Sequence, residues 1–207
     1  MNRNKPFQME TSDYRISHHD VNAVENLSEY LLSLFPRIPR EYVVVCIGTD
    51  RSTGDSLGPL TGTFLEAKRP RHLTIYGTLH QPVHATNLTD YIDEITRKHR
   101  NPFIIAVDAC LGKNTSIGYL IAGTGPIQPG AALKKSLPAI GDVHITGVVN
   151  MSGFMEHSVL QNTRLSFVMD MAEKIADLLD SLDQQLSSSF IRPAVVRKAS
   201  ENINKMS

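Results

Sequence analysis

Acidic and hydroxyl side chains crowd a short segment that follows an apolar run. The run, 42–47, is rich in β-branched residues and uniformly apolar, which is typical of a buried strand in a parallel sheet. In open α/β sheets, ligands bind at the carboxyl ends of the strands, where the next segment, 48–59, would lie. The pattern therefore predicts a functional site in that segment. Its polar candidates are Asp50, Ser52, Thr53, Asp55 and Ser56.

A second acid follows a later apolar run. Asp108 comes directly after 103–107, five apolar residues that predict another buried strand ending at this acid. Neighbouring parallel strands lie about 4.8 Å apart, so Asp55 and Asp108 can approach one another at adjacent strand ends. Paired carboxylates can supply a general acid and a general base with split pKa values. They can equally hold a divalent metal ion, especially with a histidine.

Each acid also has a purely structural explanation. Asp55 can cap the helix predicted to begin near Pro59, and Asp108 can cap the loop 109–113 through local backbone bonds. Asp50 is typical of a turn residue. An aspartate directly after five apolar residues is costly unless it is paired, capping or functional, so Asp108 is the more informative of the two strand-end acids.

Histidines are the candidates for a third catalytic or metal-binding partner. His80 and His84 lie in the loop after a predicted strand at 72–76, and His157 lies after the last predicted strand. The loop position places His80 at the active edge of the sheet, and His157 is expected at the same edge. His144 falls inside a strand and is expected to pack.

Sequence signatures of other chemistries are missing around the first acidic segment. Glycines precede the predicted helix, but the lysine and hydroxyl pair of a P-loop is absent, and the glycine spacing does not match the dinucleotide fingerprint. The hydroxyls lack the Gly-x-Ser-x-Gly pattern of a nucleophile elbow. These features disfavour nucleotide binding and serine catalysis.

Composition indicates one soluble domain. The 207 residues suffice for one sizeable α/β domain, and 21 basic against 21 acidic residues give no signal for nucleic-acid binding. No apolar run approaches the roughly 20 residues needed to cross a bilayer. The two cysteines, Cys46 and Cys110, follow apolar runs and are typical of buried thiols in a reducing compartment. We therefore expect a cytoplasmic protein with no nucleic-acid and no membrane partner.

The elements that must position the two acids alternate between strand and helix. This alternation predicts right-handed crossovers and a three-layer α/β/α domain with a mostly parallel sheet. One domain is expected at 18–186, between a flexible arm at 1–17 and a flexible polar tail at 187–207. Strands are predicted at 42–47, 72–76, 103–107, 117–122 and 143–149, and helices after Asp20, at 60–68, after Asn87 and at 163–186.

The segment 150–157 mixes apolar and polar residues at the expected active edge. It overlaps residues 151–162, which we predict to be a loop or a broken helix start. The long C-terminal helix follows. Such a surface either receives a peptide or partner chain, or packs beneath that helix.

The two acidic motifs resemble those of known peptidases. Gly54-Asp55-Ser56-Leu57-Gly58-Pro59 resembles the matching segment of the spore germination proteases, and Ala106-Val107-Asp108-Ala109 resembles their second acidic motif. The same pair of strand-end acids occurs in the hydrogenase maturation endopeptidases, which share that fold. The two motifs together resemble the YyaC family of sporulation proteins from spore-forming Firmicutes, with the resemblance extending over roughly 42–180.

This resemblance implies a domain of the phosphorylase/hydrolase type. It implies a peptidase acting on a protein or peptide substrate in the developing or germinating spore, within the forespore or spore core. Asp55 and Asp108 match the two functional acids of both peptidase groups. In the maturation endopeptidases a histidine joins them as a metal ligand, and His157 is the best positional match, with His80 second.

The chain also departs from the germination protease pattern. That pattern has proline before its first acid and alanine after it, where this chain has Gly54 and Ser56. The departure leaves room for a different substrate. It also leaves room for a non-catalytic binding or assembly factor that uses the same edge to hold a protein partner.

Overall fold

Six strands form one sheet in the computed structural model, which describes residues 13–129 and 137–191 and side chains as far as residue 186. The order across the sheet is β1-β5-β6-β4-β2-β3. The pairings among β3, β2, β4 and β6 are parallel, whereas β5 runs antiparallel to β6 and β1 antiparallel to β5. The strands are β1 (Tyr14–Ser17), β2 (Tyr42–Cys46), β3 (Leu73–Tyr76), β4 (Phe103–Gly112), β5 (Tyr119–Thr124) and β6 (Val143–Met151).

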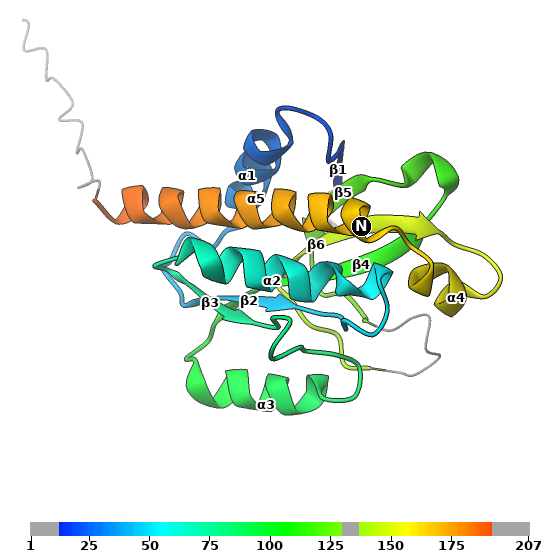
Figure 1. The fold of residues 1–207 in the computed structure, drawn as a ribbon. Helices are drawn as coiled ribbons and strands as arrows, with labels where there is room; N and C mark the ends of the chain where they lie inside the picture. The colour runs from blue at the N-terminus through cyan, green and yellow to red at the C-terminus, as the bar shows by residue number, and fades with distance from the viewer. Residues whose placement is uncertain (1–12, 130–136, 192–207) are drawn as a thin grey trace, which may run out of the picture.

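Helices cover both faces of this sheet (Figure 1). On one face lie α1 (Ala23–Leu34), α2 (Leu57–Lys68) and α5 (Leu165–Ile191), and α5 packs on both of the others. On the other face lies α3 (Leu88–Lys98), while the short α4 (Glu156–Gln161) follows β6. The predicted three-layer α/β/α architecture is therefore confirmed. Within the described ranges, no helix has the length and apolar character that crossing a membrane requires.

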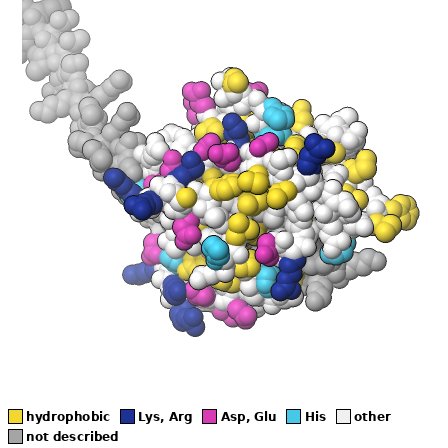
Figure 2. All heavy atoms as spheres, viewed as in Figure 1, with side chains coloured by type: hydrophobic (Ala, Val, Ile, Leu, Met, Phe, Trp, Pro, Cys, Tyr) yellow, Lys and Arg dark blue, Asp and Glu magenta, His cyan; other side chains and the backbone are white. Residues whose placement is uncertain are grey.

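The sheet separates two apolar cores, and β2 contributes to both. Val44 and Cys46 face the core beneath α1, α2 and α5, whereas Val43 and Val45 face the core beneath α3. All five residues of β2 are buried, as the uniformly apolar run predicts. Figure 2 shows the face formed by α2 and α5, where acidic and basic side chains are interspersed.

Two expected boundaries differ from the structure. Residues 14–17, expected in the flexible arm, form β1, because Tyr14 and Ile16 pack toward the core and the strand pairs with β5. Residues 187–191, expected in the flexible tail, continue α5. Residues 1–12 of the arm and 192–207 of the tail lie outside the described residues.

Asp183 ties α5 to the loop before β3. The residue is only 4 % exposed, and its carboxylate accepts the backbone N–H groups of Arg71 at 2.9 Å, His72 at 2.7 Å and Leu73 at 3.2 Å. Asp183→Asn removes the charge and turns one acceptor into a donor. We therefore expect it to lower the free energy of unfolding by about 2 kcal/mol, measured by urea denaturation.

A matched control lies on the same helix. Asp177 makes only a half-exposed ion pair with Lys68, at 2.7 Å. Asp177→Asn should therefore change the unfolding free energy by less than about 1 kcal/mol. Equal losses in the two variants would contradict the tying role of Asp183.

Candidate active site

A cavity of about 390 Å³ opens at the carboxyl ends of the parallel strands. Its walls come from the loop after β2, the loop between β3 and α3, β4 and α4. Asp55, Asp108 and His157 all line it. The structure thus brings the two acids to one place, although they lie 53 positions apart in the sequence.

The loop after β2 folds back tightly against the start of α2. Thr49 donates its backbone N–H to the Asp55 carbonyl at 3.0 Å. A Cβ at Gly48 would collide with that same carbonyl, and a Cβ at Gly58 would collide with the Ile47 carbonyl. Gly48 also has a φ of +149°, which disfavours other residues. These two glycines permit the close approach that places Asp55 at the cavity.

Asp55 does not serve as the cap of α2. The residue at the N-cap position of α2 is Ser56, and no side-chain hydrogen bond caps that helix. The helix itself begins at Leu57, three residues before the predicted start. The structural explanation offered for Asp55 is therefore not supported, and its carboxylate remains available to the cavity.

The sequence predicts that a strand ends at Asp108. In the structure Asp108 lies inside β4 instead. The strand continues to Gly112 because the residues after the acid also pair with β6, where Asp108 is opposite Thr146. Ala106 belongs to the core beneath α3, so the alternation of side chains places Asp108 on that same face. One carboxylate oxygen accepts the Ala109 N–H at 2.8 Å. The capping explanation predicts a local backbone bond of this kind, but residues 109–112 continue the strand and form no loop for Asp108 to cap.

The two carboxyl groups differ in how firmly they hold a proton. Burial raises the pKa of Asp108 to about 8, the Ala109 N–H lowers it, and the charge of Asp55 raises it again. Burial also raises the pKa of Asp55, while the Ser52 hydroxyl and His157 lower it. Asp108 thus keeps its proton to higher pH than Asp55, because its carboxyl is the more deeply enclosed even though part of the residue meets solvent.

Ser52 is a polar neighbour of Asp55 in the same loop. It is 4 % exposed, and its hydroxyl has no hydrogen bond of good geometry among the described residues. The hydroxyl is nevertheless close enough to lower the pKa of Asp55. We therefore regard this as a polar contact and not as a formed hydrogen bond. Asp50, by contrast, is exposed and lines the cavity directly.

Thr53 and Ser56 hold the loop together and do not line the cavity. The Ser56 hydroxyl donates to the Thr53 carbonyl at 2.6 Å within a short 3-10 turn, Gly54–Ser56. The Thr53 hydroxyl donates to the Gln161 carbonyl at 3.4 Å, which links this turn to α4. Their predicted supporting role is thus a positioning one.

The histidines divide between the cavity and the surface. His157 is exposed at the cavity rim, and its Nε2 lies 3.1 Å from Nε2 of Gln161. His80 is exposed and is not among the residues that line the cavity, so the structure does not bring it together with the two acids. A parallel bridge between Ile47 and Val83 brings the later part of the loop to the site, and His84 lines the cavity instead.

Sequence reasoning missed α4 as an element of the site. Leu160, from this helix, is 6 % exposed, lines the cavity and would be 2.7 Å from a Cβ at Gly54. The sequence predicts a loop or a broken helix start here, because a helix of only six residues is too short to show a clear helical periodicity. The apolar pair Val159 and Leu160 after Glu156 was the available signal.

The predicted metal ligands do not form a metal site in this arrangement. Over the described parts of the chain, no group of three His, Cys, Asp or Glu side chains could hold a metal ion, and this includes Asp55, Asp108 and His157. The oxygen and nitrogen donors suit a divalent ion chemically, but their positions do not. We assign no chemical step to a metal.

The architecture is that of a known class of α/β proteins. The chain is similar to the crystal structure of a NiFe hydrogenase maturation protease, HycI, from Thermococcus kodakarensis KOD1, with a TM-score of 0.52 and 19 % sequence identity. The match covers 75 % of this chain and 99 % of that chain. At this level of identity the likeness shows the fold alone, and it agrees with the predicted fold class.

Sequence comparison places the chain more narrowly. It belongs to the family described as "Protein of unknown function (DUF1256)", whose model matches residues 15–178. It is 51 % identical over 170 residues to "Uncharacterized protein YyaC" of Bacillus subtilis (strain 168), covering 82 % of this chain and 83 % of that protein. The resemblance to the YyaC family is thereby confirmed.

Proposed function

We propose that this protein is a peptidase that cleaves a protein or peptide substrate with Asp55 and Asp108. The observation that carries the proposal is the position of both acids in one cavity, where Asp108 has a pKa raised to about 8. Two carboxyl groups whose environments separate their pKa values are suited to act as base and acid. The fold shared with a maturation protease adds support at the level of architecture.

The roles follow from which carboxyl is protonated near neutral pH. Asp55, which releases its proton first, accepts a proton from a water molecule as the oxygen attacks the scissile carbonyl carbon. Asp108, still protonated, transfers its proton to the carbonyl oxygen as negative charge develops there. When the tetrahedral intermediate collapses, Asp108 takes this proton back as the C=O bond reforms, the C–N bond breaks, and the proton held on Asp55 passes to the leaving amine.

The cavity is suited to a short stretch of peptide. Its volume of about 390 Å³ accommodates a side chain or two together with the scissile bond. Ile47, Pro82 and Leu160 give it apolar walls beside the two acids. The substrate is therefore expected to carry an apolar side chain next to the bond that is cut.

The biological setting of the proposal is the spore. The motif around Asp55 and the motif around Asp108 resemble those of the spore germination proteases. We place the cleavage in the cytoplasm of a spore-forming cell, in the forespore or spore core, during sporulation or germination.

The direct test is the cleavage of a complex peptide mixture. Peptides from an unfolded bacterial proteome are incubated with the protein, and new termini are identified by mass spectrometry. The wild type should generate new termini, and Asp55→Asn should lose at least about 100-fold in rate. Asp93→Asn, an exposed acid on α3, is the matched control and should retain full activity. Equal cleavage by Asp55→Asn would contradict the proposal.

The pH dependence gives a second test. Because Asp108 must be protonated to act as the acid, kcat/KM should fall as the pH rises through about 8. The measurement is the initial cleavage rate of one identified peptide between about pH 5 and about pH 10. A rate that keeps increasing above pH 8 would contradict the role given to Asp108.

A second candidate function is favoured by one surface observation. Phe154 is 99 % exposed and Met155 is 75 % exposed in the loop just before α4, beside the cavity rim that His157 forms. Apolar side chains protrude at this edge in Figure 2. Exposed apolar groups of this size are typical of protein contacts, so a non-catalytic binding or assembly factor is the alternative. In that case neither the wild type nor any variant should generate new termini in the peptide mixture.

A further inference from the structure

A shallow depression at the amino ends of β2 and β4 is rich in arginine. It lies at the edge of the sheet opposite the two acids. Its walls are the connection 36–41, between α1 and β2, and residues 100–101, between α3 and β4. Three of its eight lining residues are arginines, Arg37, Arg40 and Arg100, and one is an acid, Glu41.

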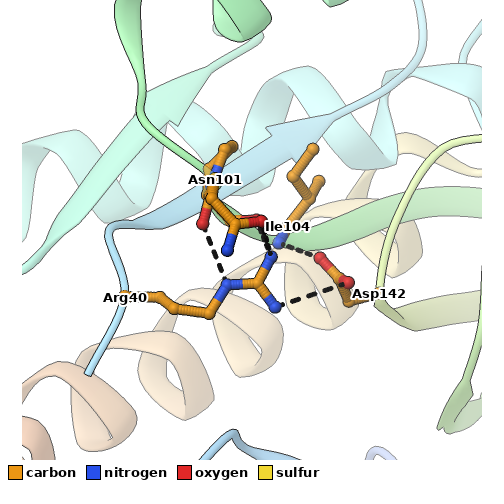
Figure 3. Close-up of polar contacts among 5 residues, drawn as sticks. Arg40, Asn101, Ile104 and Asp142 are labelled. Atoms are coloured by element: carbon orange, nitrogen blue, oxygen red, sulfur yellow. Dashed lines mark hydrogen bonds and ion pairs between the residues drawn. The ribbon is translucent and has the colours of Figure 1, made fainter. Parts of the chain in front are cut away.

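Arg40 is fixed in the floor of this depression (Figure 3). Its Nε donates to the Asn101 carbonyl at 2.9 Å, and one Nη donates to the Asn101 side-chain oxygen at 3.1 Å. Its other Nη lies 3.9 Å from Asp142, which in turn accepts the Ile104 N–H at 2.8 Å. These contacts hold the connection before β2 against the turn before β4, so Arg40 serves the fold and shapes a rigid base.

The other two arginines are not neutralised. Arg37 and Arg100 are exposed, and their guanidinium groups form no ion pair within the described ranges. The one lining acid is already engaged, because Glu41 lies 2.7 Å from His99 Nδ1 and accepts the Arg100 N–H at 3.2 Å. Arg37 and Arg100 therefore line the depression without an ion pair of their own, and the one carboxylate there, that of Glu41, is held by His99 and by the Arg100 backbone.

We propose that this depression binds a small phosphate-class dianion between Arg37 and Arg100. Each guanidinium presents a planar fork of N–H donors that fits two oxygens of a phosphoryl group. A tetrahedral dianion can occupy both forks at once, whereas a carboxylate fills only one. Pro36 and Pro39 restrict the backbone that carries Arg37, which limits the entropy lost on binding. The site is independent of the proposed peptidase activity.

The test is an NMR titration of the full chain with inorganic phosphate at constant ionic strength. The site predicts saturable shifts of the Arg100 and Asn101 amide signals. The double variant Arg37→Gln with Arg100→Gln should bind at least about tenfold more weakly. Arg164→Gln, which removes an exposed charge next to α5 at the opposite edge, is the control and should bind like the wild type.

Titrations with other ligands distinguish a phosphorylated small molecule from free phosphate as the natural ligand. Glycerol 3-phosphate binding as tightly as inorganic phosphate would assign the site to phosphorylated small molecules, and tighter inorganic phosphate would assign it to the free ion. Acetate, whose single carboxylate fills only one fork, should bind at least about tenfold more weakly than phosphate. Shifts that do not saturate, or that survive unchanged in the double variant, would overturn the proposal.

Discussion

Asp108→Asn is expected to abolish cleavage while making the protein more stable. Asparagine keeps the size of the side chain and an oxygen that can accept the Ala109 N–H, but it has no proton to donate as an acid. Loss of a general acid typically lowers the rate by about 10²–10⁴-fold. The predicted decrease in kcat/KM is therefore at least about 100-fold for any peptide that the wild type cleaves.

The gain in stability follows from the raised pKa of Asp108. The pKa lies at about 8 in the folded protein against 3.8 ordinarily, so the folded state holds a proton that the unfolded chain has released between these values. The contribution of Asp108 to stability is complete below about pH 4 and is lost as the pH rises through about 8. Asparagine stays neutral and avoids this loss.

Urea denaturation at several pH values measures the effect. At pH 8 and above, Asp108→Asn should raise the free energy of unfolding by about 1–2 kcal/mol, and the difference should shrink toward about pH 4. Asp93→Asn again serves as the control and should follow the wild type at every pH. A destabilised Asp108→Asn at pH 8 would instead favour a structural role for this acid.

Gly58→Ala is expected to produce the largest loss of stability. Gly58 is buried near the start of α2, and a Cβ there would collide with the carbonyl oxygen and the carbonyl carbon of Ile47. The Cβ is attached rigidly to the backbone of α2, and the atoms that it meets belong to the backbone of Ile47. Neither can therefore move without separating α2 from the end of β2. We expect a loss of about 3–4 kcal/mol in the free energy of unfolding.

The control for this variant isolates the collision from ordinary glycine effects. Gly125 has a φ of +88° but has no atom within 4 Å of a Cβ. Gly125→Ala should therefore cost only the backbone strain, about 1–2 kcal/mol. Circular dichroism during urea denaturation measures both variants. A Gly58→Ala loss no larger than that of Gly125→Ala would contradict the close packing of α2 on β2.

The fold could be predicted wherever a strand is buried on both faces. The apolar runs that became β2 and the first half of β4 carry their own signal, since no water-facing alternation interrupts them. The edge strand β1 has only four residues and owes its existence to pairing with β5, more than 100 positions away in the sequence. A local pattern cannot reveal such a long-range contact.

The two acids of the candidate site could be predicted from local sequence, whereas their exact setting depends on tertiary contacts. Asp108 was recognisable because an acid next to a buried strand is costly, and Asp55 because it lies in the polar segment that follows a buried strand. The place of Asp108 within β4 was missed because the residues after it look like a turn until they pair with β6. The choice of His84 over His80 depends on the bridge between Ile47 and Val83, which is a tertiary contact.

The most direct test of the account is the ionisation of Asp108 itself. Protein labelled with ¹³C at the aspartate side-chain carboxyls is titrated by NMR from about pH 3 to about pH 10, and Asp108→Asn assigns the signal. We expect one carboxyl with a titration midpoint at about pH 8 that is missing from the variant. An Asp108 carboxyl that titrates near its ordinary value of 3.8 would contradict the proposed acid and base pair.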